Sequence, residues 1–120
     1  MPKRRDLITL TPSEQRSFLE KGKTIYLATN GKDGYPQLLA MWYAMEDGNV
    51  VMTTYRKSQK VLNLRRDPRC SLLLEEGATY DQLKGVLLRG ECEILDDEEY
   101  TLNTLGRIGA RAAGTHLPRV

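Results

Sequence analysis

The sequence contains few residues of the kinds that build metal centres and redox motifs. Its 120 residues include two cysteines and one histidine. Cys70 and Cys92 form neither a CxxC motif nor a zinc-ligand pattern, so we interpret them as buried free thiols of a cytoplasmic protein. His116 has no carboxylate or cysteine at metal-ligand spacing, and we therefore expect no metal site and no catalytic histidine.

Long apolar segments and charge of one sign are also missing. No apolar run approaches the length of a membrane span, and the N-terminus, MPKRRDLITL, lacks the apolar stretch of a signal peptide. Lys and Arg together number 18 and Asp and Glu 16, which gives a net charge of +2. This balance does not favour a nucleic-acid partner. We expect a single cytoplasmic domain over residues 1–120, with no membrane contact.

Short apolar stretches separated by turn residues are typical of an antiparallel β protein. We predict strands at residues 24–29, 36–45, 50–55, 69–75 and 83–95. Helices are predicted at residues 12–22, 58–67 and 97–111, between a loose arm, 1–10, and an irregular tail, 112–120. Gly85 and Gly90 suggest bulges or bends in the last strand, of the kind a barrel needs. The pattern predicts a mostly β (α+β) fold, a small antiparallel barrel with peripheral helices.

The residue types at the helix ends indicate caps. Thr11-Pro12-Ser13-Glu14 has the form of a capping box with proline at the first helical position. Ser58 is predicted to cap the second helix with its hydroxyl, and Asp67-Pro68 to end it. We interpret the acidic run Asp96–Glu99 as the cap of the third helix and not as an acid–base pair. The residues expected on one side of that helix are Tyr100, Leu105, Ile108 and Ala112.

A basic, polar segment joins the predicted strand 50–55 to the second helix. We call it the basic corner, and it comprises Thr54, Tyr55, Arg56, Lys57, Ser58, Gln59 and Lys60. A helix N-terminus offers free backbone N–H groups and a positive partial charge, and cationic side chains add to its attraction for an anion. Phosphate is the obvious candidate. The alternative is a basic surface that meets only solvent, since such short patterns are not specific.

Three segments of the chain occur in an order that resembles the split β-barrel superfamily. They are IYLATN followed by YPQLLAMWY, then VVMTTYRKSQKVLNLRRDPRCSLLL, then GVLLRGECEIL. The pattern S-x-K-x(2)-N-L-x(2)-D-P-R at residues 58–69, followed by an apolar strand, is the most specific part. The similarity covers Phe18 to Glu99. It indicates pyridoxamine-5'-phosphate-oxidase-like flavoproteins and, more closely, the deazaflavin (F-420)-dependent reductases of the same fold.

The resemblance implies an antiparallel split β-barrel of the FMN-binding-protein type, which forms a homodimer with cofactor grooves between the two barrels. It places the cofactor phosphate at the basic corner and the ring along the second strand, with one residue of the fifth strand nearby. The cofactor-binding residues that it implies are Gln37, Leu38, Leu39, Ala40, Met41 and Trp42 on the second strand, Thr53, Thr54, Arg56, Lys57, Ser58, Gln59 and Lys60 around the corner, and Gly85 on the fifth.

Departures from the oxidase pattern bear on the cofactor. The oxidases carry arginines where this chain has Gln37 and Gln59, and they end in an arginine- and histidine-bearing segment that RAAGTHLPRV does not match. The resemblance therefore implies coenzyme F-420, with FMN as the alternative, and argues against oxidation of pyridoxamine phosphate. A non-enzymatic binder of haem or another ligand is the further alternative. Relatives often add a strand after the last helix, and its absence here suggests a truncated chain.

The implied reaction is hydride transfer between reduced deazaflavin and a small unsaturated organic substrate. The resemblance assigns no catalytic residue. Tyr55, Tyr80 or water could donate the proton that the product needs, although most tyrosines in small barrels have a packing role.

Other conspicuous residues have two interpretations each. Trp42 is expected either to wall the cofactor groove or to make a core or dimer contact. Arg65, Arg66 and Arg69 could meet a polyglutamate tail or a second phosphate, or they could form a solvated helix end with favourable charge.

Overall fold

The computed structural model describes residues 10–112. The helices are α2 (Pro12–Lys21), α3 (Gln59–Arg66) and α4 (Glu98–Ala112), with a short 3-10 helix, η1 (Tyr80–Gln82). The strands are β1 (Thr24–Asn30), β2 (Pro36–Trp42), β3 (Ala44–Glu46), β4 (Asn49–Val51), β5 (Arg69–Glu76) and β6 (Lys84–Glu91). The predicted α+β architecture of antiparallel strands with peripheral helices is confirmed. The arm up to residue 9 and the tail that carries His116 lie outside the described residues.

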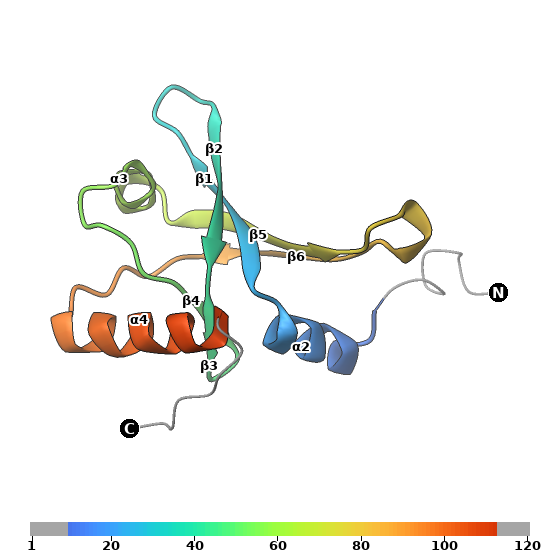
Figure 1. Ribbon diagram of the computed structural model, residues 1–120. Coiled ribbons are helices and arrows are strands. Elements are labelled where there is room, and N and C mark those ends of the chain that lie inside the picture. The colour runs from blue at the N-terminus through green and yellow to red at the C-terminus, as the bar shows by residue number, and fades with distance from the viewer. Residues whose placement is uncertain (1–9, 113–120) are drawn as a thin grey trace.

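The strands form two separate antiparallel sheets (Figure 1). Four long strands lie in the order β2-β1-β5-β6, and β3 and β4 form a two-stranded ribbon. Helices α2 and α4 and the ribbon lie on the same side of the larger sheet (Figure 1). No strand pairing joins the two sheets within residues 10–112, so these residues do not by themselves close a barrel.

The larger sheet buries one face, because side chains alternate along β1. Ile25, Leu27 and Thr29 are buried, and the residues between them are half-buried. Helix α2 and the ribbon cover this face and enclose the hydrophobic core. The central residues of the core are Leu19, Ile25, Tyr43 and Leu74.

The predicted capping box of α2 is confirmed. The Glu14 N–H donates to the Thr11 hydroxyl at 3.2 Å, and the Thr11 N–H donates to the Glu14 carboxylate at 3.0 Å. The helix ends before Gly22, as expected. A side chain at Gly22 would lie 2.4 Å from the Tyr43 hydroxyl, so glycine permits a close approach of the chain to the core.

The predicted strand over residues 36–45 is two strands, β2 and β3, which are interrupted at Tyr43. Tyr43 and Ala44 are both buried, at 1% and 5% exposure. One pleated strand cannot bury both, because neighbouring side chains point to opposite faces. The Tyr43 hydroxyl donates to the Leu19 carbonyl at 2.6 Å. This contact draws the tyrosine under the end of α2, and the chain passes from one sheet to the other.

Two other predicted strands are too long. The strand predicted at 50–55 pairs only as far as Val51, because its partner β3 has three residues. The strand predicted at 83–95 ends at Glu91, where its partner β5 begins at Arg69. Of the bulges or bends predicted at Gly85 and Gly90, bulges are absent from this ladder, because its register is unbroken from one end of β6 to the other.

Helix α4 begins where the sequence predicts. The Asp97 carboxylate accepts the Tyr100 N–H at 3.1 Å, which is the bond expected of an N-cap. Thr104 and Ile108 are buried, whereas Leu105, predicted on the same side, is 53% exposed. The buried side follows i, i+4 spacing, and Leu105 lies about 100° around the helix from Thr104. None of the helices in residues 10–112 is long and apolar enough to cross a bilayer.

Arg111 ties the end of α4 to the end of α2. Its guanidinium stacks over the Tyr43 ring, 4.3 Å from the ring centroid. It also donates to the carbonyls of Leu19 at 2.5 Å, Glu20 at 2.9 Å and Gly22 at 2.6 Å. A cation is favourable at this place because a helix C-terminus carries a negative partial charge.

Candidate functional site

A cleft of about 640 Å³ opens between α3 and α4. The connection from β4 to α3 and the connection from β6 to α4 run between these helices and form its other walls (Figure 1). Apolar side chains of the lining include Leu27, Met41, Val50, Leu64 and Ile94. The size and the apolar lining are typical of a site for a small molecule.

Charged side chains of opposite sign line the cleft from different segments. Arg56, Lys60 and Arg65, from the basic corner and α3, are the cationic wall. Glu93, Asp96, Asp97 and Glu98, around the start of α4, are the acidic wall. The side chains of Lys60 and Arg65 make no hydrogen bond or ion pair with other described residues. These two cations are therefore available to an anion.

The cleft brings together some of the predicted cofactor-binding residues. Met41, Thr53, Thr54, Arg56 and Lys60 line it. Other predicted residues do not line it, and for β2 the alternation of side chains explains part of this result. Every second side chain of this strand lies on the exposed face of the sheet. The predicted residues that do not line the cleft are Gln37, Leu38, Leu39, Ala40, Trp42, Lys57, Ser58, Gln59 and Gly85.

Ser58 occupies the N-cap position of α3, but the predicted side-chain cap is wrong. Its hydroxyl makes no hydrogen bond to the helix backbone. It lies 3.3 Å from the Thr54 hydroxyl, which engages it instead. The Ser58 N–H closes a tight turn by donating to the Tyr55 carbonyl at 3.1 Å. The first backbone N–H groups of α3 are thus left without a side-chain partner, as an anion would require.

A buried amide network joins α3 to the sheet behind the corner. Asn63 is 1% exposed. Its side-chain NH₂ donates to the Thr29 hydroxyl at 3.1 Å and to the side-chain carbonyl of Gln37 at 3.2 Å. Its carbonyl accepts from the Gln59 NH₂ at 2.9 Å. Gln37 and Gln59, the two positions that the resemblance compares with arginines of the oxidases, thus bond to the same buried residue.

The role of Asn63 does not follow from the pattern at residues 58–69, although Asn63 belongs to it. Its side-chain partners come from β1, β2 and α3, which converge only in the folded chain. The sequence signal that could have indicated this role is the amide of Asn63, which stands one residue before Leu64 on the buried side of a short helix. A buried amide needs partners for both its donor and its acceptor, and this one has them.

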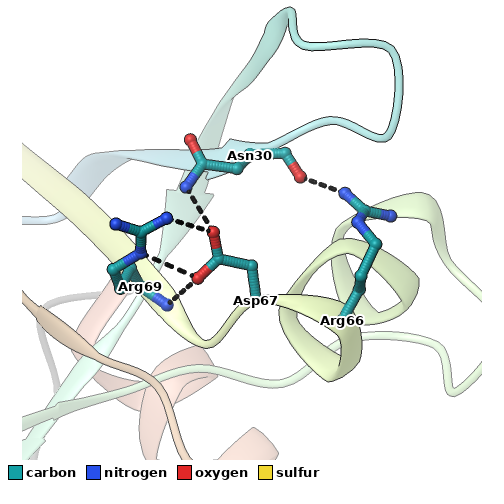
Figure 2. A network of polar contacts seen from close by, with 4 residues as sticks. All are labelled: Asn30, Arg66, Asp67 and Arg69. Atoms are coloured by element: carbon teal, nitrogen blue, oxygen red, sulfur yellow. Dashed lines mark hydrogen bonds and ion pairs between the residues drawn. The ribbon is translucent and has the colours of Figure 1, made fainter.

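The end of the same pattern forms a carboxylate clamp (Figure 2). Asp67 accepts from the Arg69 guanidinium at 2.8 and 3.0 Å, from the Arg69 N–H at 3.2 Å and from the Asn30 NH₂ at 2.9 Å. Arg66 donates to the Asn30 carbonyl. The bonds from Arg69 and then from Asn30 hold the pKa of Asp67 far below its ordinary value. Arg66 and Arg69 thus have protein partners, and Arg65 is the arginine of this group that lines the cleft.

Tyr100 lines the cleft and was not singled out as a functional residue by the sequence. Its hydroxyl donates to the Glu46 carboxylate, and this bond raises the pKa of Tyr100. Arg107 approaches the same carboxylate at 3.6 Å. Tyr55 and Tyr80, considered as proton donors, are 87% and 92% exposed and lie outside the lining.

The two cysteines are free and half-buried. Burial raises the pKa of both the Cys70 and the Cys92 thiol, so neither has the character of an activated nucleophile. Within the described part of the chain, no three His, Cys, Asp or Glu side chains are grouped so that they could hold a metal ion.

Comparison with known families identifies the fold. The family profile described as pyridoxamine 5'-phosphate oxidase matches residues 11–119. The chain belongs to the pyridoxamine 5'-phosphate oxidase family. The resemblance stated from the sequence is thereby confirmed at the level of the family. No curated protein matches this member of the family.

Solved structures share the fold of this oxidase-family chain. The conserved hypothetical protein Rv2991 from Mycobacterium tuberculosis is 43% identical, with a TM-score of 0.86 over 97% of this chain and 72% of its own. An F420 reductase is 25% identical, with a TM-score of 0.70 over 87% of this chain and 79% of its own. A FAD-binding protein from Mesorhizobium loti is 26% identical, with a TM-score of 0.63 over 78% and 69%. The solved structures that share this fold thus include an F420 reductase and a FAD-binding protein.

Proposed function

We propose that this protein is a coenzyme F-420-dependent oxidoreductase that transfers hydride between reduced deazaflavin and a small unsaturated organic molecule. The observation that carries the proposal is the position of Lys60 and Arg65, two cations without partners among residues 10–112, at one wall of a largely apolar cleft. An apolar ring with an anionic tail has the matching chemistry. The F420 reductase among the structural relatives supports the same cofactor class.

The residues of the cleft fit the parts of such a cofactor. Lys60 and Arg65 can bind a phosphate through charge-assisted hydrogen bonds, and the uncapped N-terminus of α3 adds backbone donors. Met41, Val50 and Ile94 offer an apolar surface to a ring and reduce the access of water.

The chemistry of the bound group determines what the chain itself must do. Reduced deazaflavin supplies a hydride from carbon, so the protein needs to bind the ring, orient the acceptor and exclude bulk water. Tyr55 and Tyr80 are exposed outside the cleft, and the Tyr100 proton is held by Glu46. We therefore assign the proton that the product requires to water.

The amide network supports deazaflavin over FMN. An oxidase-like FMN site relies on cations at the positions of Gln37 and Gln59, and these side chains are neutral and bonded to Asn63. The cations that line the cleft are those of the cationic wall, Arg56, Lys60 and Arg65. FMN remains the second candidate, because the FAD-binding relative shares the fold at 26% identity.

We further propose that the chain works as a homodimer of split barrels in the cytoplasm. The face of the larger sheet opposite the core exposes Leu38 at 66%, Trp42 at 54%, Leu73 at 40% and Leu87 at 62%. The strand register places Leu87 beside Leu73, so these side chains form an apolar surface that a second copy would cover.

Ligand titration tests the proposed cofactor. The purified protein is titrated with F-420 and, separately, with FMN, and binding is followed by quenching of cofactor fluorescence. We expect F-420 to bind more tightly. FMN binding ten times more tightly than F-420 would reverse the assignment, and a Soret band that forms with added haem in the absence of either response would assign a haem binder.

A further inference from the structure

The two cysteines of the chain lie on adjacent strands and on the same face of the larger sheet. Cys70 of β5 is opposite Gly90 of β6. The Cys92 N–H donates to the Pro68 carbonyl at 2.8 Å, so the antiparallel pairing continues one residue beyond the end of β6. Because side chains alternate along a strand, Gly90 and Cys92 share a face, and the two thiols are diagonal neighbours across the ladder.

Gly90 leaves open the space beside both thiols. A Cβ atom at Gly90 would meet no other atom within 4 Å. Both cysteines are half-buried, and Cys92 lines the cleft, so a small ion can reach them from solvent. Burial raises the pKa of the Cys70 thiol, and the nearby Cys92 thiol raises this pKa further. A cation held between the two sulfurs would remove their repulsion.

We propose that Cys70 and Cys92 together bind a soft monovalent metal ion, Cu(I), as a two-coordinate pair of thiolates. Thiolate ligands select soft ions such as Cu(I). A structural zinc ion takes four ligands, and residues 10–112 contain no group of three His, Cys, Asp or Glu side chains that could hold a metal ion. Two thiolates therefore fit a linear ion better than a tetrahedral one.

The spacing of the pair also favours an ion over a disulfide. Diagonal neighbours across an antiparallel ladder have Cα atoms about 7–8 Å apart, whereas disulfides usually join Cα atoms about 4.4–6.8 Å apart. With metal–sulfur bonds of about 2.3 Å, the length in zinc thiolates, an ion spans about 4.6 Å between sulfurs, against about 2.05 Å in a disulfide. The larger span suits the diagonal position of Cys70 and Cys92.

A buried hydroxyl lies beside the first thiol. Thr29 of β1 is the direct cross-strand partner of Cys70 and is 2% exposed. Its hydroxyl accepts a hydrogen bond from Asn63 and donates to none of the described residues. The Thr29 proton is therefore available to the Cys70 thiolate, and such a donor to a metal ligand favours the ligand's charged form.

Binding is an exchange of ligands without a redox step. Two S–H bonds break, two Cu–S bonds form, and two protons leave to solvent while copper stays monovalent. The complex of one Cu(I) ion with two thiolates carries a net charge of −1.

The test is an anaerobic titration of the reduced, metal-free protein with Cu(I) in competition with a colourimetric Cu(I) chelator. We expect one ion per chain, with two protons released for each ion in weakly buffered solution. Cys70→Ala and Cys92→Ala should each lower the affinity by more than the roughly tenfold to hundredfold that loss of an outer-shell partner costs. The melting temperature of each metal-free variant checks that it folds.

Two variants that keep both cysteines separate the site from general thiol binding. Gly90→Val fills the space beside the thiols and should weaken Cu(I) binding. Ser71→Val is the matched control, because residue 71 of β5 points to the opposite face and its change should leave the affinity unchanged. Wild-type affinity in Gly90→Val or in either single-cysteine variant, or release of only one proton per ion, would overturn the inference. The titration contains no flavin or deazaflavin, so its outcome is independent of the proposed function.

Discussion

Replacing Lys60 with alanine gives the sharpest test of the cationic wall. The Lys60 side chain lines the cleft and has no partner among the described residues. If it binds a cofactor phosphate, its loss removes a charge-assisted hydrogen bond that contributes about 1.5–3 kcal/mol. We expect affinity for a phosphorylated cofactor to fall by about tenfold to a hundredfold.

Two comparisons isolate the phosphate from the rest of the cofactor. Riboflavin has the ring of FMN without its phosphate, so its weaker binding should be the same in Lys60→Ala and in the wild-type protein. Lys57 is an exposed lysine three residues earlier that does not line the cleft. Lys57→Ala therefore removes the same charge from the basic corner and should have a much smaller effect.

The assay is fluorescence titration with F-420, FMN and riboflavin, together with the melting temperature of each variant. Folding should survive in both variants, because neither lysine belongs to the core. The reasoning is refuted if Lys60→Ala binds F-420 and FMN as the wild-type protein does. The same holds if Lys57→Ala loses as much affinity, since that would indicate a diffuse field and no specific contact.

Three further predictions concern the frame around the cleft. Asn63→Leu should lower the free energy of unfolding by about 1–3 kcal/mol in urea titration, because it leaves the buried Thr29 hydroxyl without its amide partner. A loss below about 0.5 kcal/mol, the size of an ordinary surface change, would contradict the network. The folded-state pKa of Asp67 lies below its ordinary value of 3.8, so its contribution to stability is complete above that pH and is lost as the pH falls further. The difference in melting temperature between the wild-type protein and Asp67→Asn should therefore close in acid, and a difference that widens below pH 3.8 would be inconsistent with the clamp. Sedimentation at micromolar concentration should show a dimer that Leu87→Glu dissociates, whereas a wild-type species of only 13.6 kDa would rule the dimer out.

Local signals in the sequence predict the elements of this fold but not all of their lengths. The capping box at Thr11 and the end of α3 at Asp67 depend on neighbouring residues, and both are as predicted. The ends of β4 and β6 depend on where the partner strands stop, which no local pattern contains. The break at Tyr43 has the same origin, because a contact with α2 turns the chain there.

One wall of the candidate site could be predicted from the sequence and the other could not. The basic corner is visible in the sequence because its cations and polar residues are contiguous, and Arg56 and Lys60 do line the cleft. The acidic wall comes from the segment around the start of α4, where the sequence analysis assigns Asp96–Glu99 only to capping and gives Glu93 no role. The pairing of Asp96 with Arg56 spans 40 residues, so it could be found only once the two connections were placed side by side.

Arg111 has a consequence for how the chain reaches its native state. Its bonds to α2 close loops of 89 to 92 residues, nearly the whole described chain. Contacts of such long sequence separation are entropically costly to form and slow folding. During synthesis from the N-terminus, the carbonyls at the end of α2 cannot bond to this arginine until α4 has been made. The core beneath α2 is therefore expected to become fully protected against hydrogen exchange late, and α4 to complete the fold as it docks.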